Sequence, residues 1–152
     1  MTSWREHESG GGSGGGPRLD LLLVDDEEKI LESLSELFQD RYSVTTAGGS
    51  DEALEAFRAT RPQLVLCDQR MPGRTGIDLL REMREIEPGT IRMLITGHSD
   101  IEVVIEAVND QILHHYVTKP WVNEDLVATV DRMARRYLEE NGLVGGDEQI
   151  LF

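Results

Sequence analysis

The sequence predicts an α/β, doubly wound fold in which a five-stranded parallel sheet is covered by five helices. Five short apolar runs alternate along the chain with five segments whose apolar residues recur at helical spacing. Hydrophobic residues make up 39% of the chain but aromatic residues only 5%, which is typical of a core built from aliphatic strands. A chain of 152 residues is long enough for one ordinary domain.

The first half of the domain contains three predicted strands and two predicted helices. Each strand is a short run of apolar or β-branched residues, and each helix shows one apolar face. Ser50 is a favourable residue for capping the second helix, and the acids that follow it suit a first helical turn. The predicted strands are 21–24, 42–46 and 64–67, and the predicted helices are 27–38 and 50–59.

The second half contains the remaining two strands and three helices. A loop rich in Pro and Gly precedes the third helix, and a Pro-Gly pair ends it. The fourth helix is expected to be capped by Ser99 or Asp100, and the fifth by Asn123. The predicted strands are 91–95 and 115–118, and the helices are 77–86, one that ends near 109 and one that ends near 140.

The predicted domain covers residues 19–140 and leaves a tail on each side. Residues 1–18 contain a Gly- and Ser-rich stretch, which predicts a flexible tail or linker. Residues 141–152 are expected to form a flexible tail or the start of a truncated linker.

The overall charge restricts the surfaces to which this chain could bind. Its net charge of −14 argues against direct binding to nucleic acid and to an anionic membrane. No apolar run approaches the roughly 18 residues that a membrane span needs. The single cysteine, Cys67, excludes an intrachain disulfide and fits a reducing compartment. We therefore expect a cytoplasmic protein.

Carboxylates stand where two of the predicted strands end. Asp25 and Asp26 follow the first strand, and Asp68 follows the third. The carboxyl ends of parallel strands share one edge of a sheet, so these groups are expected to converge. Carboxylates so close together repel unless a cation is near, and oxygen ligands suit Mg²⁺. Asp68 could also act as a nucleophile towards phosphorus.

Two further groups suited to phosphoryl chemistry follow the fourth and fifth predicted strands. The hydroxyl of Thr96 could donate a hydrogen bond to a phosphoryl oxygen, and Gly97 leaves room beside it. Lys119 could pair with a carboxylate or with a phosphoryl oxygen. The bond from Lys119 to Pro120 could be cis or trans. Taken singly, each site residue also fits a structural role, such as a helix cap, a turn or a surface lysine.

The combined pattern resembles the receiver domain of two-component response regulators over residues 19–140. The resemblance implies a flavodoxin-like fold with strand order 2-1-3-4-5 and identifies a signalling domain rather than an enzyme. The Asp-Gln-Arg-Met-Pro-Gly and Lys-Pro-Trp runs resemble a subclass often joined to larger output domains. The matching segments, in the family's order, are 22–26, 66–73, 95–97 and 116–120.

The resemblance implies a role for each site residue. Asp68 corresponds to the phosphoacceptor, which receives a phosphoryl group from a histidine kinase, a phosphotransfer protein or a small phosphodonor. The implied Mg²⁺ ligands are Asp25, Asp26, Asp68 and the backbone carbonyl of Arg70. The implied phosphoryl contacts are Thr96, Gly97 and Lys119, and the implied switch residues are Thr96 and Tyr116.

The resemblance also implies partners on a particular surface. Phosphorylation is expected to change the face formed by the fourth helix, the fifth strand and the fifth helix. That face would control an output domain or a downstream protein, and a homodimer through it is a further expectation. Arg70 and His98 occupy variable positions next to the site, where the family adjusts the lifetime of the phosphoryl group.

Three other functions are alternatives to a phosphorylatable receiver. An aspartyl-phosphate phosphohydrolase usually has a second Asp two residues after the nucleophile, where this chain has Arg70. A nucleotide-binding module would need a Gly-rich loop after the first strand, where this chain has a run of acids. A receiver-like interaction scaffold that is never phosphorylated is the main alternative, although all five site groups are present.

Overall fold

A single parallel sheet forms the centre of the computed structural model, which describes residues 18–142. The strand order is β2-β1-β3-β4-β5, and every neighbouring pair is parallel. This order confirms the predicted flavodoxin-like fold. The strands are β1 (Asp20–Val24), β2 (Ser43–Ala47), β3 (Leu64–Asp68), β4 (Ile91–Thr96) and β5 (His115–Thr118).

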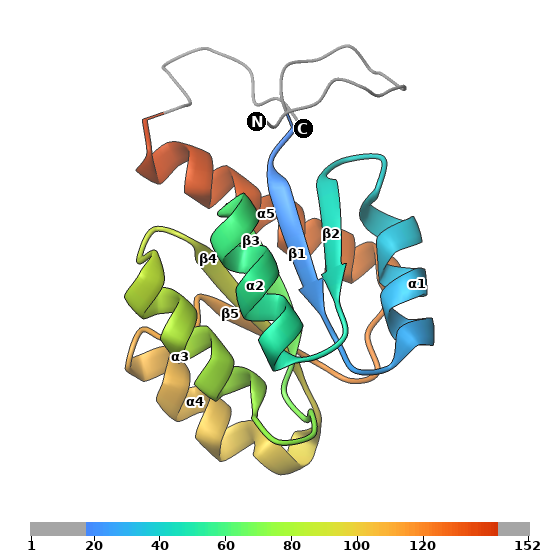
Figure 1. Ribbon diagram of the computed structural model, residues 1–152, viewed down its shortest axis with the longest axis vertical. Helices are drawn as coiled ribbons and strands as arrows, with labels where there is room; N and C mark the ends of the chain where they lie inside the picture. Colours follow the sequence, from blue (N-terminus) through green and yellow to red (C-terminus); the bar gives the residue numbers. More distant parts are fainter. Residues whose placement is uncertain (1–17, 143–152) are drawn as a thin grey trace.

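Five α-helices alternate with the strands and cover both faces of the sheet (Figure 1). Helices α1 and α5 lie on one face, and α2, α3 and α4 lie on the other. A short 3-10 turn, η1, precedes α4. The bounds are α1 (Glu28–Phe38), α2 (Ser50–Thr60), α3 (Gly76–Ile86), η1 (His98–Asp100), α4 (Ile101–Asn109) and α5 (Asn123–Glu140).

Alternating strand residues build two separate hydrophobic cores. Successive side chains of a strand point to opposite faces, and both faces of this sheet are covered. Leu22, Val65 and Leu94 belong to the core beneath α2, α3 and α4. Leu21 and Leu64, one residue earlier on their strands, belong to the core beneath α1 and α5. Because both faces of the strands are packed, the strand ends that carry the candidate site residues are held in place by the two cores.

The predicted helix caps are confirmed only in part: Asp100 occupies the N-cap position of α4, although its side chain makes no capping hydrogen bond. Helix α2 begins at Ser50 itself, and its N-cap is Gly49. Helix α5 begins at Asn123, whose Oδ1 accepts a hydrogen bond of 3.1 Å from Nε1 of Trp121 instead of from the helix backbone. Thr75, which was not predicted as a cap, accepts a hydrogen bond of 3.2 Å from the backbone N–H of Asp78 at the start of α3. Propensity therefore located the helix starts but not the side chains that cap them.

The predicted tails lie mostly beyond the part of the chain that the structure describes. Residues 1–17 and 143–152 are outside it, so the proposed tails of 1–18 and 141–152 stay predictions. Helices and strands run from Asp20 to Glu140 within the described residues. No helix in this described part is long and apolar enough to cross a membrane.

Candidate phosphoryl and metal site

Three carboxylates meet at the carboxyl edge of the sheet. Strands β1 and β3 are neighbours, with Val24 paired to Cys67, so the residues that follow these two come together. Asp25, Asp26 and Asp68 each offer an oxygen, and these oxygens lie within 4.8 Å of one another. Asp25 is 2% exposed and Asp68 4% exposed, whereas Asp26 is open to solvent. The predicted convergence of these three residues is therefore observed.

Asp25 is held in a position that disfavours its charge. Burial raises the pKa of Asp25 to about 6, and the nearby charge of Asp68 acts in the same direction. One carboxylate oxygen accepts a hydrogen bond of 2.8 Å from the backbone N–H of Glu27, which partly offsets this effect. A cation bound beside Asp25 would therefore stabilise the ionised form of its carboxylate.

Lys119 supplies a positive charge to the carboxylate cluster. Its Nζ lies 2.9 Å from Oδ1 of Asp68 in an ion pair. Burial disfavours the ammonium form, but the hydrogen bond to Asp68 and the charges of Asp68 and Asp25 outweigh it and raise the pKa of Lys119. The Lys119-Pro120 bond, left open by the sequence, is cis. The backbone N–H of Lys119 donates to the carbonyl of Thr96 over 2.9 Å, which joins the ends of β4 and β5.

Thr96 and Tyr116 lie on the same face of the sheet. Thr96 is 1% exposed, and its hydroxyl donates to the carbonyl of Gly97 over 3.3 Å. Leu94, two residues earlier, and Tyr116 on β5 both pack into the core that α4 covers. The alternation of strand side chains places Thr96 on this face as well. A movement of Thr96 would therefore change the packing of Tyr116 and α4 in this core.

The loop after Asp68 is anchored by residues that the sequence analysis did not identify. Gln69 is 5% exposed, and its side-chain oxygen accepts a hydrogen bond of 3.0 Å from the backbone N–H of Ile77. Its backbone N–H donates to the carbonyl of Ile95 over 2.9 Å. A Cβ on Gly76 would overlap the backbone carbonyl of Asp68. A Gln and a Gly beside a Pro- and Gly-rich loop give no distinctive sequence signal, so only the fold identifies them.

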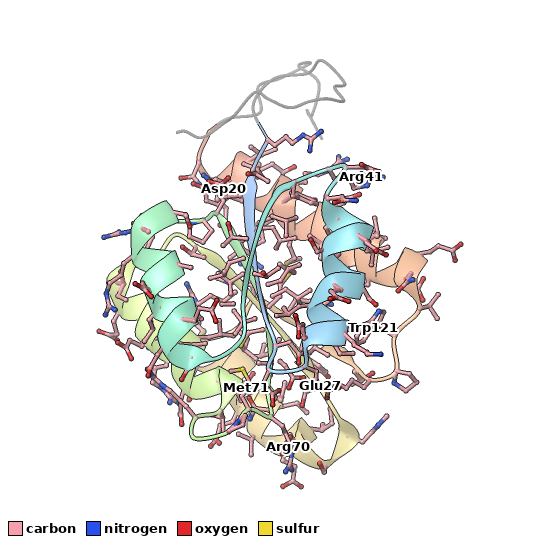
Figure 2. The ribbon with its side chains drawn as sticks, turned by 45° about the vertical axis from the view of Figure 1, so that its right-hand side comes forward. Asp20, Glu27, Arg41, Arg70, Met71 and Trp121 are labelled. Carbon is pink, nitrogen blue, oxygen red and sulfur yellow. The ribbon has the colours of Figure 1, made fainter. Side chains whose placement is uncertain are left out.

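Arg70 lies at the rim of the same site. Its guanidinium forms an ion pair with Asp100, with Nε 3.0 Å from one carboxylate oxygen and a terminal nitrogen 3.1 Å from the other. Figure 2 shows Arg70, Met71 and Glu27 gathered at one end of the molecule, opposite Asp20 and Arg41. The side chain of Cys67 packs in the core beneath α2, α3 and α4, on the other face of the sheet from Asp68. Burial there raises the pKa of its thiol, so a nucleophilic role is not supported.

The donor set fits a hard divalent cation. It consists of three carboxylates with nearby oxygens, two of them buried, with a single lysine paired to one of them. Mg²⁺ prefers such oxygen ligands and often keeps several waters, which the exposed Asp26 side would admit. A cleft of about 590 Å³ runs from Asp25 and Asp26 along α1. Its other acidic lining residues, which favour the approach of cations, are Glu28, Glu32, Glu36 and Glu52.

Comparison with known proteins agrees with this geometry. A family model described as the response regulator receiver domain matches residues 21–131. The hydrogenase transcriptional regulatory protein HoxA of Cupriavidus necator is 38% identical over 125 residues, which cover 82% of this chain and 25% of that protein. The DNA-binding transcriptional regulator NtrC of Klebsiella pneumoniae is 32% identical and matches 78% of this chain and 25% of its own length. This chain therefore spans about a quarter of these two relatives.

Solved structures show the same fold. A response regulator receiver domain protein from Clostridium thermocellum has a TM-score of 0.74 and 31% identity, over 78% of this chain and 95% of that one. NtrX from Brucella abortus has a TM-score of 0.76 and 26% identity, over 83% of this chain and 29% of that one. The similarity thus extends both to an isolated domain and to a domain within a longer regulator.

Proposed function

This chain belongs to the family of response regulator receiver domains, and we propose that Asp68 is its phosphoacceptor. The observation that carries the proposal is the ion pair of 2.9 Å between Lys119 and Asp68, set beside two further carboxylates. The domain would receive a phosphoryl group from the phosphohistidine of a sensor kinase or phosphotransfer protein. It would then act as a two-state switch within a two-component system.

The chemistry follows from the charges around Asp68. A carboxylate oxygen of Asp68 attacks phosphorus in line, a P–O bond forms, and the P–N bond of the donor breaks with its electron pair left on the imidazole. Lys119 then exchanges its contact with the carboxylate for one with the new phosphoryl oxygens. Mg²⁺, held by Asp25, Asp26, Asp68 and the carbonyl of Arg70, would neutralise charge on those oxygens.

The proposed switch begins at Thr96. The hydroxyl would leave the Gly97 carbonyl and donate to the phosphoryl group, while the backbone of Gly97 gives that group room. Tyr116 would then move towards the space behind Thr96, and α4 would respond because both pack in one core. Support for α4 as part of the output face comes from its two exposed apolar residues, Val103 (51% exposed) and Ile105 (45% exposed).

The proposed partners follow from the length of the relatives. HoxA and NtrC are about four times as long as the matched region, since it covers 25% of each. We propose that this receiver controls an output domain or a downstream protein, with a homodimer through α4, β5 and α5 as one route. It would act as a signalling domain and not as an enzyme, and it would not contact nucleic acid itself. The free thiol of Cys67 supports the proposed cytoplasmic location.

Direct phosphorylation tests this function. The 152-residue chain is incubated with Mg²⁺ and phosphoramidate, and its intact mass is measured. We expect one added phosphoryl group, none in Asp68→Asn, and none when EDTA removes the metal. Asp78→Asn, which changes an exposed aspartate on α3, is the matched control and should be modified like the unaltered chain. A folded chain that stays unmodified would favour the alternative of an interaction scaffold.

A further inference from the structure

The ion pair between Arg70 and Asp100 spans two segments that border the proposed phosphorylation site. Arg70 lies two residues after Asp68 in the β3–α3 connection, and Asp100 ends η1, which follows Thr96 and Gly97. The pair is bidentate, with distances of 3.0 and 3.1 Å, and the hydroxyl of Ser99 lies 3.3 Å from the same guanidinium. In Figure 2, Arg70 lies beside the segment that leads into α4.

Asp100 occupies a position in which its carboxylate would ordinarily have another partner. It is the residue immediately before α4, and an aspartate there usually accepts hydrogen bonds from the first backbone N–H groups of the helix. Here its side chain makes no such bond: its backbone (φ −108°, ψ 12°) is not in the extended region typical of a capping residue, and both of its oxygens face Arg70. Helix α4 thus begins without a side-chain cap while the ion pair is intact.

Arg70 would likewise gain an alternative partner if Asp68, two residues before it in the chain, were phosphorylated. Its side chain is 71% exposed, so it can change direction without disturbing the core, whereas that of Asp100 is only 16% exposed and stays at the start of α4. A phosphoryl group on Asp68 would carry about two negative charges in place of the single carboxylate charge, and it would present three strong acceptor oxygens. A guanidinium binds such a group in the same two-pronged manner as a carboxylate.

We propose that Arg70 exchanges Asp100 for the phosphoryl group and that the released Asp100 then caps α4. This inference rests on the proposed phosphorylation of Asp68 and adds a second route from that site to the output face. The first route runs through Thr96 and Tyr116 inside the core, and the second runs along the rim. In this exchange Asp100 gives up the guanidinium for the backbone N–H groups of α4, and its backbone moves from φ −108° and ψ 12° towards the extended region of a capping residue, so the proposal is a switch between two arrangements.

Two variants separate the two halves of the exchange. Asp100→Asn removes the competing carboxylate, so the apparent dissociation constant for beryllofluoride, a mimic of the phosphoryl group, should fall by about two- to fivefold at saturating Mg²⁺. Arg70→Gln keeps the backbone carbonyl but removes the guanidinium, so that affinity should not increase. The Arg70→Gln substitution instead frees Asp100 to cap α4. The amide signals of Glu102 and Val103, near the start of α4, should therefore shift in the absence of beryllofluoride, in the same direction as beryllofluoride shifts them in the unaltered chain.

Controls distinguish this inference from the function on which it rests. Arg74→Gln breaks a different ion pair of the same loop, with Glu82, and should change neither the affinity nor those two amides. The inference is overturned if the unaltered chain responds to beryllofluoride but Asp100→Asn binds it equally well or Arg70→Gln leaves the amides of Glu102 and Val103 in place. If the unaltered chain gives no response, or Asp68→Asn responds equally, the proposed function fails and the exchange fails with it.

Discussion

At the scale of single residues, the site brings together carboxylates that repel one another unless a cation is bound. Asp25 is almost fully buried beside Asp68, and its raised pKa of about 6 reflects that burial. Lys119 compensates for one carboxylate but is itself part of the proposed chemistry. These residues therefore suit the proposed binding of Mg²⁺ and the proposed phosphoryl transfer. Their repulsion makes the metal-free domain less stable than it would be with fewer charges in the site.

Neutralising Asp26 should stabilise the domain and remove its response to metal. In Asp26→Asn, repulsion with Asp25 and Asp68 decreases, so we expect the free energy of unfolding without metal to rise by about 1 kcal/mol or less. Mg²⁺ should raise the melting temperature of the unaltered chain but not that of the variant, because one ligand is lost.

Thermal unfolding with and without Mg²⁺, followed by circular dichroism, measures both effects. Asp40→Asn, an exposed aspartate between α1 and β2, is the control and should keep the full response to Mg²⁺. An Asp26→Asn variant that still gains stability with Mg²⁺ to the same extent would contradict the proposed metal site.

At the scale of elements, the position of Asp68 depends on how closely α3 approaches the end of β3. Gly76, the first residue of α3, donates its backbone N–H to the carbonyl of Gln69 over 2.9 Å. The absence of a side chain lets this turn pass directly over the carbonyl of Asp68 and against Leu94. The helix start therefore fixes the loop that follows Asp68, the proposed phosphoacceptor at the end of β3.

A methyl group at Gly76 should disturb both stability and site. In Gly76→Ala the new Cβ overlaps backbone atoms that cannot move freely, so we expect a loss of about 1–3 kcal/mol in urea denaturation. The matched control is Gly89→Ala, because a Cβ at the exposed Gly89 would meet only the flexible side chain of Glu87, at 3.5 Å. Equal stabilities for the two variants would show that the close approach at Gly76 is unimportant.

The connection into β5 should make stability sensitive to acid. His114 accepts a hydrogen bond of 2.9 Å at Nδ1 from the backbone N–H of Arg92. Burial lowers the pKa of His114 from 6.5 to about 4, the charges of Arg92 and Arg136 act in the same direction, and Glu140 opposes them. Between those two pH values the unfolded chain binds the proton more readily, so the contribution of His114 to stability falls as the pH falls from 6.5 to 4.

Replacing His114 by a side chain that does not titrate should flatten this dependence. His114→Gln retains an acceptor for Arg92, so urea unfolding between pH 7 and pH 4.5 should show a smaller loss of stability than in the unaltered chain. His98→Gln, at the opposite end of β4, is the control and should keep the original slope. A parallel pH profile for His114→Gln and the unaltered chain would exclude this role of His114.

At the scale of the whole molecule, the sequence predicts the elements that follow simple periodicities. The parallel sheet, its five helices and the meeting of Asp25, Asp26 and Asp68 were all predictable, because alternation of strands and helices forces the strand ends to one edge. The order of the strands came from the family resemblance and not from periodicity. The outcome confirms the fold, while the roles of the site residues stay predictions.

Contacts between distant loops were not predictable from the same sequence. Arg92 lies in an apolar strand, yet it is 2% exposed, and its guanidinium donates to backbone carbonyls that include those of Thr90 and Ile112. Arg70 and Asp100 are 30 residues apart and pair only because the fold brings their loops together. Such partners depend on tertiary geometry, which no local pattern of charge encodes.

We propose that a change at Asp68 reaches the face of α4. Amide NMR of the full chain, recorded with Mg²⁺ and then with beryllofluoride, would follow that change residue by residue. We expect shifts at Asp26, Thr96 and Lys119 that continue to Tyr116 and into α4, and that are absent in Asp68→Asn. Shifts confined to the metal ligands, or an unchanged response in Asp68→Asn, would contradict the switch and leave a receiver-shaped scaffold.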